Sequence, residues 1–132
     1  MKHVNAAIAI VAIMIFSLAC VSAFQEVPDL RGQWHAEGVG PEGPYIAKVG
    51  IGQRGRVVFI RWNISPDEQY EGFGMIAGDT LVASSIQQGA YSVSMIYKIQ
   101  GDTLTGEWPE PEEAQIWTET LKRVTSSLNA RR

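Results

Sequence analysis

Apolar residues occupy every second position along most of this chain, and this period is the feature that most restricts its fold. In the segment YSVSMIYKI, Tyr91, Val93 and Met95 share one face, while Ser92 and Ser94 lie on the other. The segments PYIAKVGI and VVFIRWNI alternate in the same way. Successive side chains of a β-strand point to opposite faces, so this period indicates strands with one buried face. No segment after residue 23 shows a helical period.

Turn sequences rich in Gly, Pro and Asp separate eight such segments. Because every connection is short, we expect consecutive strands to pair antiparallel. Eight strands in this order predict an all-β fold, an antiparallel up-and-down barrel that leaves no exposed sheet edge. A two-sheet sandwich with Greek-key connections is the alternative, although it normally needs one long crossing loop. The expected strands are 33–37, 44–52, 57–64, 69–77, 80–86, 90–99, 103–108 and 116–123.

One turn sequence, Gly-Asp-Thr-Leu, occurs twice, at 78–81 and 101–104. Gly tolerates a positive φ, and the Asp carboxylate can accept a hydrogen bond from the backbone just ahead. The repeat therefore predicts two hairpin turns, each leading into a new strand. A calcium or phosphate loop would need several more oxygen ligands or a glycine-rich helix start, and neither follows.

The N-terminus has the pattern of a secretory signal peptide. Lys2 precedes an apolar run from Ala6 to Ala19, and small residues lead to an expected cleavage after Ala23. The run is too short for a membrane helix with anchoring flanks. Cys20 offers a rival, because SLAC resembles a lipobox with Leu18 one position late. We expect a signal peptide (1–23), a barrel domain (24–123), a polar tail (124–132) and secreted or periplasmic export, with a lipoprotein held through Cys20 as the alternative.

Charge and cysteine content restrict the partners of the exported chain. With Lys2 removed, ten basic and fourteen acidic residues give a net charge of −4. Nucleic-acid binding, which needs a basic surface, is not expected, nor is membrane association unless Cys20 is lipidated. Cys20 is the single cysteine, so the domain forms no internal disulfide.

Gly32, Trp34 and Arg123 carry a resemblance to a known group of proteins. Gly32-Gln33-Trp34 in the first strand, with Arg123 in the last, resembles the Gly-x-Trp and distant Arg of calycins, which include lipocalins and avidins. The resemblance implies that Arg123 packs over Trp34 and closes one barrel end, with Gly32 leaving room for the entering chain. The short length and lack of a C-terminal helix are more similar to avidins. The order PEGPY, RW, GFG, GDTL and TETLKR also resembles small exported bacterial proteins of unknown activity, some labelled fibronectin-binding protein.

The residues do not indicate an enzyme. His35 is the one histidine after the expected cleavage site, and it is expected on the rim or surface. No nucleophile elbow and no zinc-ligand set accompany it. Glu110, Glu112 and Glu113 could supply a carboxylate pair, but they lie among prolines and indicate a solvated turn. We therefore expect no catalytic residue, no metal site and no cofactor.

Alternating aromatic residues are the candidate binding residues. Aromatic side chains with polar tips suit both a filled core and a small ligand. Glu119 alternates with Trp117 and Leu121, so it should also face inward and need a partner, for which Arg61 and Arg123 are the candidates. Two function classes remain open: a module that binds a small, partly apolar ligand, and a filled barrel that contacts a host protein or inhibits a periplasmic enzyme. The residues expected in the barrel interior are Tyr45, Trp62, Tyr91, Tyr97, Trp108 and Glu119.

Overall fold

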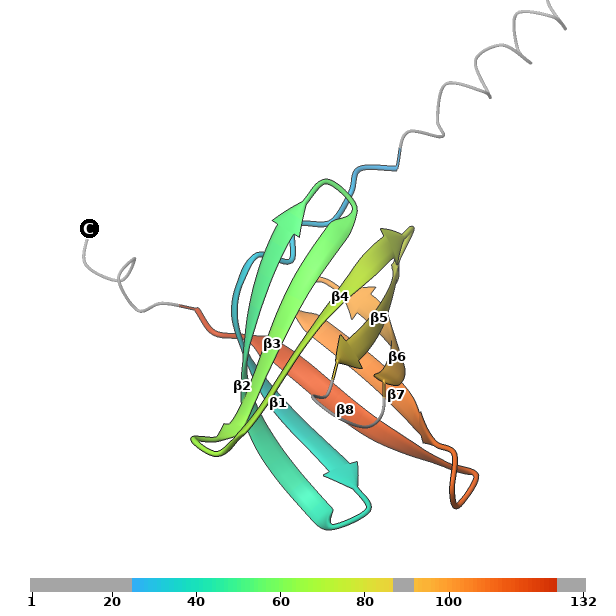
Figure 1. Cartoon of the computed structure of the whole chain (residues 1–132). Helices are drawn as coiled ribbons and strands as arrows, with labels where there is room; N and C mark the ends of the chain where they lie inside the picture. Colours follow the sequence, from blue (N-terminus) through green and yellow to red (C-terminus); the bar gives the residue numbers. More distant parts are fainter. Residues whose placement is uncertain (1–24, 87–91, 126–132) are drawn as a thin grey trace, which may run out of the picture.

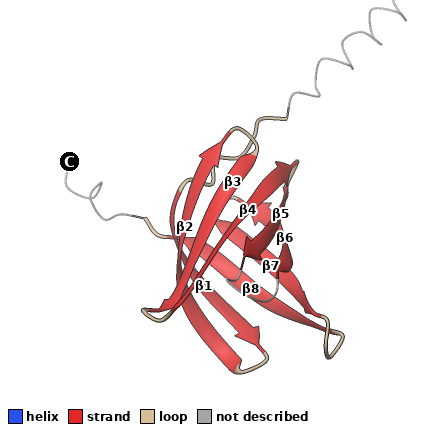
Figure 2. Ribbon diagram, viewed as in Figure 1, coloured by secondary structure: helices blue, strands red, loops and turns tan. Residues whose placement is uncertain are grey.

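A computed structural model describes residues 25–86 and 92–125. The chain forms eight antiparallel strands joined in sequence order into one closed barrel, as predicted (Figure 1). Figure 2 shows strands and connecting loops in this part of the chain. The strands are β1 (Gly32–Gly40), β2 (Gly43–Arg54), β3 (Val57–Ser65), β4 (Glu68–Ala77), β5 (Thr80–Ile86), β6 (Ser92–Gln100), β7 (Thr103–Glu110) and β8 (Gln115–Arg123).

Pairing between the first and last strands closes the barrel. β1 and β8 are antiparallel, with Trp34 opposite Arg123 and Gly38 opposite Glu119. The Greek-key sandwich is therefore the wrong alternative, because each strand pairs with its neighbours in sequence. The expected signal peptide, Cys20, Tyr91 and most of the C-terminal tail lie outside the described residues. No helix among the described residues is long and apolar enough to span a membrane.

The first two strands exceed their predicted lengths most. The first reaches Gly40 instead of residue 37, because its pairing with β2 continues to Gly40 opposite Gly43. The second runs on to Arg54, which pairs with Val57 across a tight turn. Cross-strand hydrogen bonds thus extend strands into Gly-rich sequence that has low β-propensity by itself.

The core is formed by the inward-facing residues of the alternating segments. Trp34, Val49 and Tyr97 are almost completely buried, and their sequence neighbours are exposed except for the half-buried Gly50. Burial of these side chains is the main source of stability for a domain of this size. The buried hydrophobic residues are Leu30, Trp34, Ala36, Ala47, Val49, Ile51, Val58, Ile60, Trp62, Ile76, Leu81, Ala83, Tyr97, Leu104 and Leu121.

Three equivalent turns lie at one end of the barrel, which we call the closed end. Each begins with a glycine of positive φ: Gly55 at 60°, Gly78 at 62° and Gly101 at 59°. A positive φ at the first central position is the property of type II′ turns, which match the twist of the flanking strands. The second residue of each turn accepts a backbone hydrogen bond from the strand after next: Arg56 from Ile76, Asp79 from Ile99 and Asp102 from Arg123.

The repeated Gly-Asp-Thr-Leu sequence therefore marks consecutive hairpin turns of the closed end, as predicted. Its aspartates differ from expectation in their partners. The Asp79 carboxylate accepts from the Thr80 hydroxyl, and the Asp102 carboxylate accepts from the Arg123 side chain. Both carboxylates thus bind side chains, and the backbone carbonyls join each turn to the strand after next.

Candidate functional site in the barrel interior

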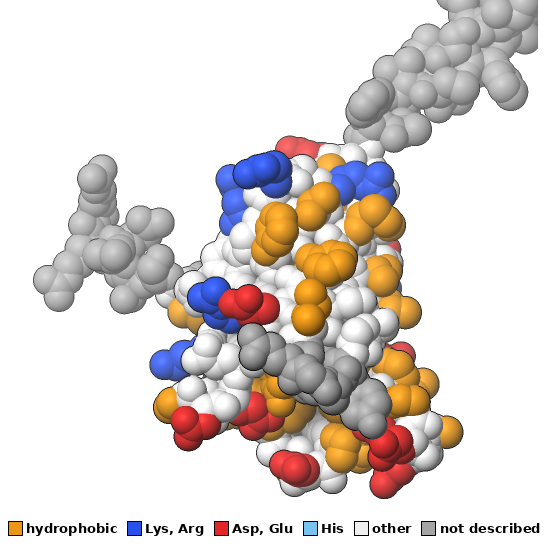
Figure 3. Space-filling view, in the orientation of Figure 1, with side chains coloured by type: hydrophobic (Ala, Val, Ile, Leu, Met, Phe, Trp, Pro, Cys, Tyr) orange, Lys and Arg blue, Asp and Glu red, His pale blue; other side chains and the backbone are white. Residues whose placement is uncertain are grey.

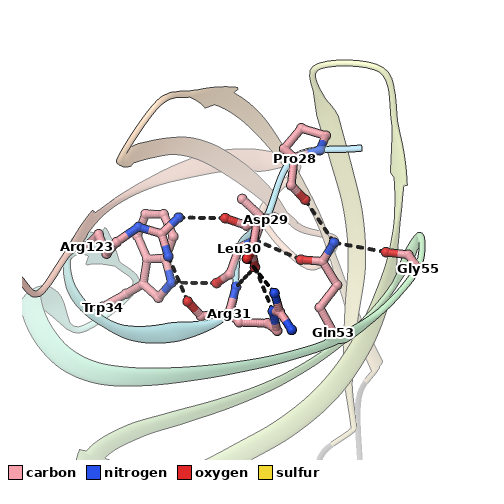
Figure 4. Close-up of polar contacts among 8 residues, drawn as sticks. All are labelled: Pro28, Asp29, Leu30, Arg31, Trp34, Gln53, Gly55 and Arg123. Carbon is pink, nitrogen blue, oxygen red and sulfur yellow. Dashed lines mark hydrogen bonds and ion pairs between the residues drawn. The ribbon is translucent and has the colours of Figure 1, made fainter. Parts of the chain in front are cut away.

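Trp34 and Arg123 meet at the closed end in the predicted contact. The Arg123 guanidinium lies 4.4 Å from the centroid of the Trp34 ring, within the range of a cation–π contact. It also donates hydrogen bonds of 2.7 Å to the carbonyls of Arg31 and Asp29 (Figure 4). A third, also of 2.7 Å, goes to the Asp102 carboxylate. The Trp34 N–H donates to the Leu30 carbonyl at 2.9 Å. Arg123 therefore binds the N-terminal segment to the barrel.

Gly32 has a different role from the one that the resemblance implied. A Cβ atom at this position would lie 3.8 Å from the Arg123 guanidinium, which is an ordinary contact. The backbone of Gly32, however, has a φ of 131°, a conformation that is strained for any residue with a side chain. The position requires glycine because of its backbone conformation, and crowding is not the reason.

Gln53 completes the closed end and was not predicted. Its amide N–H groups donate to the carbonyls of Pro28 and Gly55, and its amide oxygen accepts from the Leu30 N–H (Figure 4). Nearby, hydrogen bonds from Arg31 hold the pKa of Asp29 well below its usual range. The sequence shows Gln53 only as part of a polar turn, because two of its three partners, Pro28 and Leu30, lie more than 20 residues away in the N-terminal segment.

Glu119 lies at the centre of the polar group inside the barrel. Only 3% of its surface is exposed. The Tyr45 hydroxyl donates to one carboxyl oxygen at 3.0 Å, and the Tyr97 hydroxyl donates to the other at 2.5 Å. The expected arginine partners are wrong. Arg61 points outward and pairs with Glu71, and Arg123 serves the closed end, so tyrosine hydroxyls replace an ion pair.

Two glycines make this arrangement possible. Gly38 lies between Tyr45 and Glu119 across β2, β1 and β8, and Gly106 lies between Glu119 and Tyr97 across β8, β7 and β6. A Cβ atom on either glycine would come within 2.4 Å of the adjacent tyrosine ring. The row Tyr45–Gly38–Glu119–Gly106–Tyr97 is therefore the candidate site, which we call the tyrosine–glutamate row. Sequence reasoning missed both glycines, because their opposite residues are set by strand register.

Two tryptophans adjoin this row, as predicted. The buried Trp62 N–H faces Glu119 and Tyr97 and tends to lower the pKa of both groups, but it forms no hydrogen bond with an atom of the described residues. Trp108 tends to lower the pKa of Tyr45, and its ring centroid lies 6.3 Å from that of Trp117. Four predicted interior aromatic residues, two tyrosines and two tryptophans, thus gather with Glu119.

Burial controls the ionisation of the row. Loss of solvent raises the pKa of Glu119, and the hydrogen bonds from Tyr97 and Tyr45 only partly oppose this effect. Burial and the neighbouring carboxyl also raise the pKa of both tyrosines, so they remain hydrogen-bond donors. The row therefore offers one carboxyl group that can change its charge when its surroundings change.

Tyr45 lies in β2 beside the hairpin 40–43, at a barrel end that carries acidic turns, and we call it the acidic end. The hairpins 40–43, 65–68 and 110–115 contain no Lys, Arg or His. Figure 3 shows acidic side chains gathered at this end and basic side chains at the opposite one. Tyr70 donates to Glu68, and burial with this contact raises its pKa to about 12. The acidic residues of the three hairpins are Glu42, Asp67, Glu68, Glu110, Glu112 and Glu113.

Other features of the described chain do not form a second chemical site. His35 is exposed on β1, as predicted, with its ring 3.5 Å from Glu37. Within the described ranges, no group of three or more His, Cys, Asp or Glu residues could hold a metal ion. Hollows of about 400 Å³ and 510 Å³ lie at the closed end and on the outer face of β2 to β4.

No protein-family model matches the chain, and no curated protein is significantly similar to it.

Proposed function

We propose that this protein is a non-enzymatic binding module that takes a small, partly apolar ligand at the acidic end of the barrel. The observation that carries the proposal is the buried Glu119 carboxyl, held by Tyr45 and Tyr97 across two glycines. A buried carboxyl costs free energy unless its environment compensates it, and a hydrophobic residue would fill a structural core more simply. Ligand sites commonly combine aromatic walls with a few polar groups of this kind.

The charges around the row restrict the ligand to a neutral molecule or a cation. Glu119 and the surrounding acidic turns disfavour an anion, and they attract a cation toward the barrel end. Tyr45, Trp108 and Trp117 are partly exposed inward-facing aromatic residues, whose ring faces favour an ammonium group. The Trp62 N–H, which forms no hydrogen bond to a described residue, would donate a hydrogen bond to an oxygen atom of the ligand. The preferred ligand is therefore an organic cation with a hydroxyl or carbonyl oxygen.

Three molecules of the same branched shape test this preference: choline, its neutral analogue 3,3-dimethylbutan-1-ol, and the anion 3,3-dimethylbutanoate. Titration calorimetry should rank the cation above the neutral alcohol and the anion last. Glu119→Gln should weaken choline at least tenfold, equivalent to about 1.4 kcal/mol, with a smaller effect on the alcohol. Glu71→Gln, which removes an outward carboxylate, is the matched control. Equal affinity for all three molecules would contradict the role of Glu119, and absence of binding at millimolar concentration would contradict the proposed site.

The same proposal includes kinship with calycins and export from the cell. Support for kinship comes from the Arg123 contact with Trp34 and from the closed eight-stranded barrel. Support for export comes from the apolar N-terminal run and the small residues before Phe24. Intact mass of the protein from its host tests export: a chain that begins at Phe24 supports soluble export, and a diacylated Cys20 would show a lipoprotein instead.

A further inference from the structure

The outer face of β3, β4 and β5 carries large apolar side chains that contact water. Phe59 and Phe73 are opposite each other on β3 and β4, and they are 56% and 55% exposed. The next row of the same face contains Val57, Met75 and Val82 on three adjacent strands. Hydrophobic side chains form a group over β3 and β4 in Figure 3. We call these five residues the phenylalanine ridge.

The ridge is comparable in size to the largest apolar patch on a typical monomer. A buried aromatic side chain covers about 150 to 250 Å², so two half-exposed Phe residues offer about 200 Å² between them. With Val57, Met75 and Val82, each about half exposed, the ridge reaches about 400 Å², within the range of the largest apolar patch on a typical monomer, which is often functional. Such a ridge indicates a contact surface.

A hollow of about 510 Å³ adjoins the ridge on the side of β2. Gly50 and Gly52 face outward there, opposite Arg61 and Phe59, and they leave the surface without side chains. The row Gly52–Phe59–Phe73 thus passes from an empty position to two large rings on three adjacent strands. A protruding group and a hollow on one face can fit a second copy that is turned around, as an isologous interface requires.

We propose that two copies of this chain associate through this face, with the phenylalanine ridge of each copy in the glycine hollow of the other. A two-fold axis near Phe59 brings Phe73 of one copy above Gly52 of its mate. The exposed Arg61–Glu71 pair borders the contact and supplies both charges to it. Ridge and hollow from both copies would bury about 1,000 Å², the lower limit for a specific interface. We therefore expect a dimer that dissociates in the micromolar range.

This face lies on the outside of the barrel, away from Glu119, so the dimer and the proposed ligand site can be tested separately. Purified protein, with its N-terminus established by intact mass, is followed by sedimentation velocity from about 1 μM to about 1 mM, which spans binding free energies of about −8 to −4 kcal/mol. The wild type should change from monomer to dimer within this range. Phe73→Ser should raise the dimer dissociation constant at least tenfold.

Two further variants separate this interface from general hydrophobic association. Gly52→Glu fills the hollow without removing an apolar atom, and its Cβ has ordinary contact with Phe59 at 4.0 Å, so we expect a folded monomer. Ile116→Ser removes a side chain that is 64% exposed on β8, outside the ridge, and should leave the dimer intact. A wild type that stays monomeric at all concentrations would overturn the proposal. So would a dimer that resists both Phe73→Ser and Gly52→Glu, or one that Ile116→Ser weakens equally.

Discussion

The two ends of the barrel use their polar groups differently. At the closed end, Arg123 and Gln53 donate to backbone carbonyls or to Asp102, and the carbonyls of three turns accept backbone hydrogen bonds from the strand after next. In the barrel interior that leads to the acidic end, side chains bind side chains, as Tyr45 and Tyr97 bind Glu119. The Trp62 and Trp117 N–H groups find no acceptor among the described residues.

This difference suggests that the closed end mainly stabilises the fold and that the acidic end mainly binds the ligand. Backbone carbonyls have fixed positions in the barrel, so bonds to them hold the closed end in one geometry. Hydrogen bonds between side chains can be exchanged for bonds to a ligand with less disturbance of the strands. We therefore expect substitutions at the closed end to change stability most, and substitutions near the acidic end to change binding.

The largest effect is expected on the free energy of unfolding when one tryptophan from each end is replaced by alanine. Trp34→Ala should destabilise the protein by about 3 to 5 kcal/mol, because the ring is completely packed and its N–H is bonded. Trp108→Ala should cost only about 1 to 2 kcal/mol, because part of that ring contacts water. Urea unfolding followed by circular dichroism measures both values. Equal losses would remove the proposed difference between the ends.

A second comparison tests the glycines of the tyrosine–glutamate row. Gly106→Ala places a Cβ 2.4 Å from the Tyr97 ring, so we expect a loss of about 2 to 3 kcal/mol from overpacking. Gly52→Ala on the outer face of β2 is the control. Its Cβ would make only a 4.0 Å contact, and we expect stability within about 0.5 kcal/mol of wild type. If Gly106→Ala unfolds at the wild-type urea midpoint, the tyrosine has moved freely and the row is not tightly packed.

Arg123→Ala tests how much Arg123 stabilises the closed end. The variant loses the contact with the Trp34 ring and three hydrogen bonds, and we expect a cost of about 2 kcal/mol. Arg123→Lys should recover only part of it, because an ammonium cannot stack and donate as a planar guanidinium does. Lys122→Ala, at an exposed neighbouring position, should change unfolding by less than about 0.5 kcal/mol. Equal midpoints for Arg123→Ala and Lys122→Ala would show that Arg123 contributes no more than a surface residue.

The smallest effect, a pH dependence, concerns Glu119. Its pKa is raised in the folded protein above the ordinary 4.5, so the folded state holds this proton more firmly than the unfolded state does. The resulting stability is complete below the unfolded pKa, and it is lost as the pH rises from about 4.5 through the folded pKa. Glu119→Gln cannot ionise. It should cost about 1 kcal/mol or less near pH 4, and its stability relative to wild type should improve as the pH rises.

Urea midpoints of wild type and Glu119→Gln across this pH range measure the effect. Tyr97→Phe removes a donor that lowers the pKa of Glu119, so the loss of stability should begin at the same unfolded pKa and continue to higher pH. A constant difference between wild type and Glu119→Gln at every pH would contradict a buried, titrating carboxyl.

The sequence by itself determined the barrel and which residues face its interior. Alternation is a local property of each strand, and Gly-Asp turns are local too, so Tyr45, Trp62 and Glu119 could be placed inside without knowledge of any contact. The contact of Trp34 with Arg123 was also predictable, because the resemblance to calycins supplied the distant partner. These predictions needed only local sequence patterns and the one long-range pair, Trp34 and Arg123, that the resemblance supplied.

The tertiary structure alone decided which residues meet. Strand register placed Gly38 and Gly106 beside Glu119 and gave its carboxyl two tyrosines, where the sequence suggested an arginine. Register also placed Phe59 opposite Phe73 and Gly52 opposite Phe59. Phe59 and Phe73 are 14 positions apart in the sequence, so the sequence alone did not indicate that their rings meet. Side-chain alternation tells only on which face a residue lies. The position along the barrel depends on how eight strands shift against one another when the sheet closes, and that shift is a property of the whole chain.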